Sequence, residues 1–98
     1  MKIEAKVFKI EAKVFEINDR LTRLEAEQAA AEAELSALRL IDDDAQRDAV
    51  LGFDRLEATS TRADVRRFEQ VLEEIDRRRG ELLGRRQRLL DRLITPIE

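Results

Sequence analysis

The sequence predicts an all-α protein: a long antiparallel coiled-coil helical hairpin with a short connecting helix, forming part of an oligomeric bundle. Three observations lead to this prediction. The segment Lys-Ile-Glu-Ala-Lys-Val-Phe occurs twice in succession, at residues 2–8 and 9–15. Apolar residues then recur at alternating spacings of three and four, which is the period of a coiled-coil seam. Charged residues make up 42% of the chain, and Ala, Glu, Leu and Arg are frequent, a composition typical of long helices.

The composition also limits the chemistry that the chain can perform. It contains 98 residues with four Phe, no Trp and no Tyr, so helical packing of Leu, Ile, Val and Ala must supply the core. Cys and His are absent, which removes disulfides, thiol nucleophiles, the usual zinc ligands and the commonest general base. No glycine-rich phosphate loop is present, and the hydroxyl side chains have no histidine base. We therefore expect a protein that is not an enzyme and that holds no metal or cofactor.

We expect a single helical domain over residues 1–98, whose first helix runs from about residue 2 to 40. Residues 1–15 form a duplicated heptad extension, and residues 16–40 complete the helix. All four lysines lie within the first thirteen residues, whereas all fifteen arginines lie from Arg20 onward. This division indicates that the extension has a different origin from the rest of the chain. An engineered insertion of one heptad and a native tandem duplication both explain it.

The apolar residues of the first helix define a seam and a second face. The seam, at heptad positions a and d, comprises Ile3, Val7, Ile10, Val14, Ile17, Leu21, Leu24, Ala31, Leu35 and Leu38. Phe8 and Phe15 lie outside this seam at position b, with Ala5 and Ala12 beside them at position f. An apolar arc of this width exceeds what one partner helix covers. We expect both phenylalanines to be buried against another helix, most simply a helix from another subunit.

Residues 41–61 interrupt the heptad pattern and are predicted to form a connector with a short helix at about 44–57. The three aspartates at 42–44 suit the positive N-terminal end of such a helix. Thr61 and Asp64 have the spacing of a capping pair for the helix that follows. The polar residues of this region are therefore interpreted as helix caps.

The last helix is predicted over residues 62–95, and Pro96 stops it. Its seam contains Val65, Phe68, Leu72, Ile75, Arg79, Leu82, Arg86, Leu89 and Leu93. We expect the two long helices to fold back on each other in an antiparallel register that places Ile17 beside Leu89. In this register the first lysine-rich heptad extends past the partner helix, so its apolar residues need another chain.

Self-association follows from these apolar residues. The candidate residues lie in the first part of the first helix and at the end of the last helix: Ile3, Val7, Phe8, Ile10, Val14, Phe15, Leu90 and Leu93. The function that the sequence favours is a structural or interaction protein that forms a homo-oligomer through coiled-coil packing; a different protein partner stays open. We expect a cytoplasmic protein without membrane contact, because no run approaches the roughly 18 apolar residues of a membrane span.

A cluster of arginines supports an alternative function as a nucleic-acid-associated helical module. Residues 76–92 carry seven arginines against three acidic residues. Basic clusters bind phosphate backbones, and the candidate contacts are Arg77, Arg78, Arg85 and Arg88. A solvated helix face with ion pairs explains the same pattern, and no aromatic or fold-level signature of nucleic-acid binding accompanies it. Nucleic acid is therefore the less favoured partner.

Overall fold

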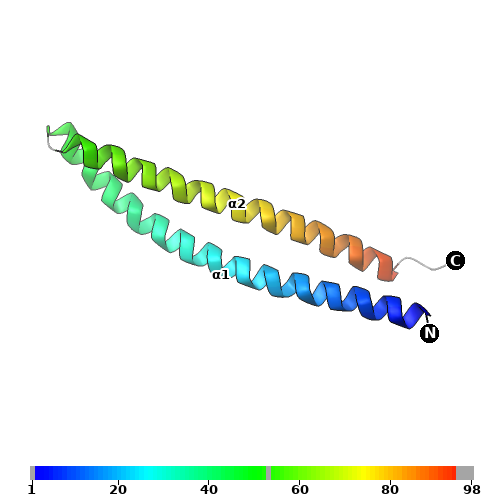
Figure 1. The fold of residues 1–98 in the computed structure, drawn as a ribbon. Helices are drawn as coiled ribbons and strands as arrows, with labels where there is room; N and C mark the ends of the chain where they lie inside the picture. The colour runs from blue at the N-terminus through cyan, green and yellow to red at the C-terminus, as the bar shows by residue number, and fades with distance from the viewer. Residues whose placement is uncertain (1, 53, 95–98) are drawn as a thin grey trace. The chain divides into compact units, whose positions relative to one another are not determined.

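The computed structural model describes residues 2–52 and 54–94, with side chains from Glu4 onward. These residues form two long helices, α1 (Lys2–Val50) and α2 (Arg55–Ile94), and none of them forms a strand (Figure 1). The prediction of an all-α protein is confirmed. The chain divides into two compact units, each built from one part of α1 and one part of α2. Unit 1 contains Met1–Ala26 and Asp76–Glu98, and unit 2 contains Glu27–Ile75.

The turn between the two helices lies in unit 2 and is built from two helix caps. Gly52 has a φ of 90°, the left-handed conformation that favours glycine, and its N–H donates to the carbonyl of Ala49 at 3.1 Å. Asp54 caps α2, because its Oδ1 accepts from the backbone N–H of Leu56 at 3.0 Å and of Glu57 at 3.1 Å. A glycine therefore ends α1, and an aspartate starts α2.

Small and branched apolar side chains form the core of unit 2. The buried apolar residues come from both helices: Ala31, Leu35, Ala45, Ala58, Val65 and Ile75. Leu35, Val65 and Ile75 are buried at predicted seam positions. Ala45 and Ala58 are buried close to the turn, where a small side chain lets two helices approach closely.

A polar network joins α1 to α2 within this unit. Oδ1 of Asp42 accepts hydrogen bonds from Thr61 Oγ1 at 2.9 Å and from Gln46 Nε2 at 3.0 Å. Gln46 Nε2 also donates to the carbonyl of Ala58 at 2.7 Å, and Arg62 Nε lies 4.0 Å from the second oxygen of Asp42. These contacts show that the helices run antiparallel here, since residues earlier in α1 meet residues later in α2. The hydrogen bond from Gln46, followed by that from Thr61 and the charge of Arg62, lowers the pKa of Asp42 against the opposing effect of burial.

The predicted connector over 41–61 with its own short helix is wrong. α1 continues through the three aspartates, and α2 begins six residues before Thr61. The capping pair of Thr61 and Asp64 is wrong for the same reason, because both residues lie inside α2. Polar residues that resemble caps in the sequence instead contact each other between the helices, as Asp42 and Thr61 do.

Unit 1 pairs the beginning of α1 with the end of α2. Its buried apolar side chains are Ile17, Leu21 and Leu24, all at predicted seam positions. Arg86 Nη1 donates to Asn18 Oδ1 across the two helices at 2.8 Å. Ile17 and Leu89 line the same hollow, as the predicted antiparallel register requires.

Candidate interaction surfaces

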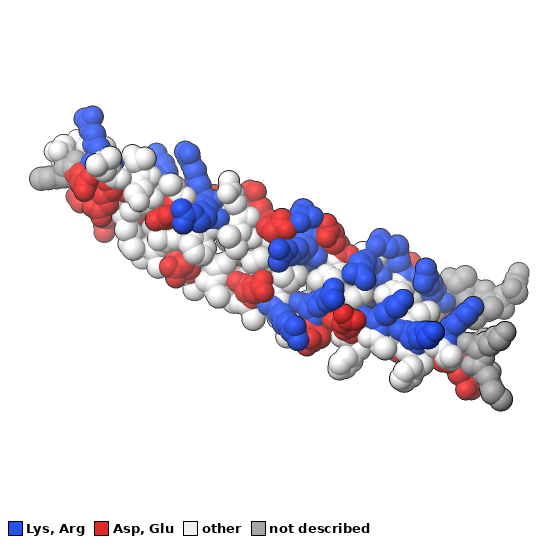
Figure 2. Space-filling view, in the orientation of Figure 1, with Lys and Arg blue, Asp and Glu red and all other residues white. Residues whose placement is uncertain are grey.

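A basic groove lies between the two helices of unit 1. We define it by five cations: Lys13, Arg20, Arg85, Arg88 and Arg92. On α2 the three arginines are separated by three and four residues, which places them on one face of the helix. On α1 the two cations are seven residues apart and also share a face. Helical spacing on both elements therefore concentrates positive charge in one place. Figure 2 shows Lys and Arg side chains gathered over this part of the chain.

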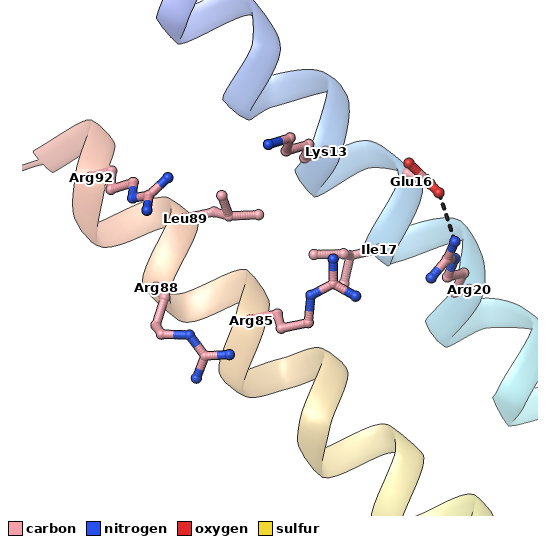
Figure 3. A pocket seen from close by; sticks show the side chains of 8 residues that line it. All are labelled: Lys13, Glu16, Ile17, Arg20, Arg85, Arg88, Leu89 and Arg92. Atoms are coloured by element: carbon pink, nitrogen blue, oxygen red, sulfur yellow. Dashed lines mark hydrogen bonds and ion pairs between the residues drawn. The ribbon is translucent and has the colours of Figure 1, made fainter.

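The floor of the basic groove is apolar. Ile17 is buried and Leu89 is half-buried, and the two side chains point toward one another between the helices (Figure 3). The hollow has a volume of about 310 Å³. Glu16 is the one acidic side chain among the described residues that line it, and its Oε1 lies 2.8 Å from Arg20 Nη2. The lining thus combines an aliphatic floor with a rim of excess positive charge.

Four of the five cations keep their charge uncompensated. Within the described part of the chain, no hydrogen bond or ion pair reaches these side chains: Lys13, Arg85, Arg88 and Arg92. Arginine guanidinium groups bind carboxylates and phosphates through two parallel hydrogen bonds. The basic groove is therefore suited to an anionic partner.

A second hollow of about 470 Å³ continues the basic groove, since both are lined by Lys13 and Arg92. Its other lining residues are three apolar and two basic side chains: Val7, Ile10, Leu93, Lys6 and Lys9. Part of the first repeat therefore borders α2, and the predicted extension past the partner helix is wrong for these residues. The second hollow adds apolar surface to the groove without adding negative charge.

The outer side of α1 carries an exposed apolar stripe in unit 1. Phe8 is 71% exposed and Phe15 is 78% exposed. Ala5 and Ala12 are exposed beside them, three or four residues away. We call these four residues the Phe stripe. Nothing in the described part of unit 1 covers the two rings, so the stripe has no partner among these residues.

The turn of unit 2 carries another exposed apolar surface, which we call the apolar tip. Its residues are Val50, Leu51 and Leu56, which are 86%, 69% and 83% exposed. Exposed acidic residues lie within about two helical turns of it: Asp43, Asp44, Asp48, Asp54 and Glu57. The same stretch contains two cations, Arg47 and Arg55. The apolar tip therefore has a predominantly acidic surround.

Charge is segregated between the two units. Unit 1 carries thirteen Lys and Arg against nine Asp and Glu, a net charge of +4. Unit 2 carries six Lys and Arg against thirteen Asp and Glu, a net charge of −7. Red acidic side chains are visible beside the turn of unit 2 in Figure 2. The chain's overall charge of −3 conceals this difference.

The structure separates the predicted self-association residues into two sets. Phe8 and Phe15 lie on the exposed stripe. The other set is half-buried or borders the second hollow: Val7, Ile10, Val14, Leu90 and Leu93. Ile3 belongs to the same prediction, but its side chain lies outside the described residues. The candidates therefore do not form one surface.

Two of the four candidate phosphate contacts, Arg85 and Arg88, meet in the basic groove, whereas Arg77 and Arg78 are not among its lining residues. Arg77 Nη1 pairs with Glu81 Oε1 at 2.6 Å. Three cations of the groove are absent from the sequence-based candidates: Lys13, Arg20 and Arg92. The predicted antiparallel register could have identified these three cations, because it brings together the faces of α1 and α2 on which they lie.

Comparison with known proteins finds no match to a family model, to a curated protein or to a solved structure. None of the helices, over the residues that the structure describes, is long and apolar enough to cross a membrane. In the same ranges no three acidic side chains lie close enough together to hold a metal ion. The surfaces of the two units are therefore the features from which a function can be inferred.

Proposed function

We propose that the chain is a non-enzymatic structural protein that self-associates by coiled-coil packing of its helices, with the Phe stripe as the principal contact. The observation that supports this proposal is the exposure of Phe8 and Phe15 on one side of α1. A phenylalanine ring offers about 150–250 Å² of surface, and its burial stabilises an interface by roughly 1.5–3 kcal/mol. Two such rings on one helix are a substantial driving force for association.

The spacing of the Phe stripe supports a helix as its partner. Ala5, Phe8, Ala12 and Phe15 follow one another at intervals of three, four and three residues. This is the period at which one helix packs along another in a coiled coil. The small alanines leave room beside the large rings, and alternating large and small side chains favours interdigitation.

The charges beside the Phe stripe support another copy of the chain as that partner. Glu4 and Glu11 border the stripe on one side, and Lys9 borders it on the other. In a parallel pair of α1 helices the acidic side of each helix faces the basic side of the other, so Glu4 comes near Lys9 of the second copy. Glu16 follows Lys9 on the same side, but its charge is already compensated by Arg20 at 2.8 Å.

The test replaces both rings by glutamine in the full chain, Phe8→Gln together with Phe15→Gln. Helicity measured by circular dichroism should stay unchanged, because both side chains are exposed in the single chain. The molar mass in solution, measured by sedimentation at high salt, should fall toward the 11.4 kDa of one chain. Loss of two rings at about 1.5–3 kcal/mol each should raise the dissociation constant at least about hundredfold.

Leu40→Gln is the matched control, because Leu40 is a 70% exposed apolar residue of α1 in unit 2. This variant should keep the molar mass of the wild type. Two results would contradict the proposal. One is a wild-type chain that is monomeric at high micromolar concentration, and the other is a double Phe variant with the wild-type mass.

The basic groove supports a second candidate function, the binding of a nucleic-acid backbone. The observation in its favour is the set of groove cations that have no ion-pair partner among the described residues. A short DNA duplex should then bind with an affinity that falls steeply with salt. Arg85→Gln with Arg88→Gln should weaken this binding, and Arg77→Gln is the control because Arg77 pairs with Glu81. No binding at low salt would exclude this function.

A further inference from the structure

We propose that the apolar tip of one copy docks in the basic groove of another copy. This contact differs from the one made by the Phe stripe. The inference rests on the proposed function only in that the partner is again a copy of this chain. It joins two unlike surfaces, an apolar tip with acidic neighbours and a groove with an apolar floor and a basic rim.

The apolar tip is held in a defined arrangement by the turn that carries it. Hydrogen bonds at Gly52 and Asp54 fix the end of α1 and the start of α2 on either side of the turn. Three large aliphatic side chains are therefore presented to solvent from a structured segment. A preorganised surface loses less conformational entropy on binding than a flexible one, which favours its use as a docking element.

The floor of the basic groove matches the tip in polarity. Ile17 and Leu89 line the first hollow, and Val7, Ile10 and Leu93 line the second. The hollows have volumes of about 310 and 470 Å³ and share two lining residues, so they adjoin one another. Aliphatic side chains of a second copy would lose contact with water here by packing against aliphatic side chains of the first.

The two surfaces carry charges of opposite sign. Seven cations line the two hollows, and Glu16 is the one acidic side chain among their described lining residues. Five exposed acidic residues and two arginines accompany the apolar tip over residues 43–57. Arg47 lies 3.8 Å from Asp44 and compensates one of these charges weakly, because both side chains are exposed. Complementary charge of this kind steers two surfaces together and fixes their orientation.

A second copy of the chain would cover both the tip and the groove, whereas a nucleic acid or a membrane would suit only one of them. A nucleic acid would satisfy the cations of the groove and leave the apolar tip exposed. An anionic membrane would accept the aliphatic side chains but would be repelled by the acidic residues beside them. The segregation of net charge, +4 in unit 1 and −7 in unit 2, extends this complementarity beyond the immediate contact.

This contact is heterologous, because a copy that offers its tip still has an unoccupied groove. Association can therefore continue from copy to copy until a ring closes or an open chain forms. The Phe stripe, in contrast, pairs with itself in a parallel arrangement. The two contacts give different dependences of molar mass on protein concentration.

The experiment uses the full chain with both Phe→Gln substitutions, so that the contact of the proposed function is absent. The tip variant adds Val50→Ser and Leu56→Ser, and the groove variant adds Arg85→Glu and Arg88→Glu. The parent should associate at low salt, and each variant alone should associate at least about tenfold more weakly, because each lacks one half of the contact. Mixed together, the two variants should form a one-to-one dimer that grows no further. Each variant contributes the surface that the other lacks.

Salt and matched controls separate this contact from nonspecific association. Raising the ionic strength to about 1 M shortens the screening length to about 3 Å, so association of the parent should weaken at least about tenfold. Leu40→Ser and Arg39→Glu alter exposed residues of α1 outside both surfaces and should leave association unchanged.

Three results would overturn the inference: a parent that is monomeric at low salt, a tip variant that associates as the parent does, or a mixture that stays monomeric. A groove that binds a short DNA duplex but no second copy would assign it to nucleic acid instead. The proposed function fails on a different result, a double Phe variant with the molar mass of the wild type. The two proposals can therefore fail independently.

Discussion

At the scale of single residues, Asp42 shows how one carboxylate can specify the pairing of two helices. It accepts hydrogen bonds from Gln46 on its own helix and from Thr61 on the other. Displacing α2 along α1 would leave a half-buried carboxylate without the hydroxyl donor, at the cost of an unsatisfied polar group. Asp43 and Asp44 beside it are exposed. Only one of three identical neighbours therefore contributes to the register.

The substitution Asp42→Asn tests this role, because its effect on the melting temperature should depend on pH. The pKa of Asp42 is lowered in the folded chain, chiefly by the hydrogen bond from Gln46. Its ionised form therefore stabilises the fold above the unfolded-state pKa of about 3.9, and this contribution disappears as the pH falls through the lower folded-state value. The wild type should melt at a higher temperature than Asp42→Asn at pH 7, and this difference should shrink below about pH 4.

Asp43→Asn is the control for this pair of melting curves. Asp43 is exposed, so its replacement should give the same melting temperature as the wild type at neutral pH. If the difference in melting temperature between the wild type and Asp42→Asn is constant from pH 7 to pH 3, the ionised carboxylate is not the stabilising species.

At the scale of elements, the turn combines a backbone conformation that favours glycine with a helix cap. Gly52 adopts a positive φ, and Asp54 accepts two backbone hydrogen bonds at the start of α2. The described residues between the helices, Leu51, Gly52 and Asp54, are exposed. Local chemistry therefore contributes to where the chain reverses.

Two glycine substitutions should have opposite effects. Gly52→Ala should destabilise the chain by about 1–2 kcal/mol, because a side chain disfavours the left-handed conformation. Gly80→Ala should stabilise it by up to about 1 kcal/mol, because alanine has the higher helix propensity. No atom within 4 Å would obstruct the added methyl group at Gly80. Urea unfolding of both variants, made with the two Phe→Gln substitutions, measures these changes without a contribution from the Phe stripe.

A destabilised Gly80→Ala variant would show that the helix near this position packs more closely than the structure indicates. An unaffected Gly52→Ala variant would show that the turn readily adopts another conformation. The contrast between two identical substitutions removes any general effect of the change in residue type.

The sequence contains the signals for the real turn, but it also contains competing ones. Glycine after a helix and aspartate before the next are ordinary boundary signals, and Gly52 and Asp54 carry them. The aspartates at 42–44 and the threonine at 61 give signals of similar strength. Local patterns cannot tell that Asp42 and Thr61 face one another, because that contact depends on how the helices pair. The helices were therefore predictable, and their ends were not.

At the scale of the whole molecule, each unit has its own buried residues and its own sign of net charge. The burial of Ile17, Leu21 and Leu24 was predictable, since spacings of three and four residues place side chains on one face of a helix. The basic groove was only partly predictable, because its cations come from two helices and meet only when the register is known. The net charge of each unit can be counted only when the structure has shown which residues belong to which unit.

Leu24→Asp tests the core of unit 1. Leu24 is buried, and a carboxylate in an apolar core without a partner costs several kcal/mol. This is a large part of the roughly 5–15 kcal/mol that stabilises a typical domain. The mean residue ellipticity at 222 nm should therefore fall in this variant. Leu40→Asp, at an exposed position, should keep the wild-type signal, and equal helicity in both variants would be inconsistent with the seam.

The uninterrupted course of α1 through both copies of its seven-residue repeat has a consequence for the size of the groove. Seven residues advance a helix by about 10.5 Å and rotate it by nearly two full turns. Lys6 and Lys13 are the same residue of the repeat in successive copies, and both line the second hollow. Adding or removing a copy would therefore lengthen or shorten the α1 side of the groove in steps of about 10.5 Å and leave the α2 side unchanged. The α1 wall of the groove can therefore change in length by duplication alone, without a single substitution.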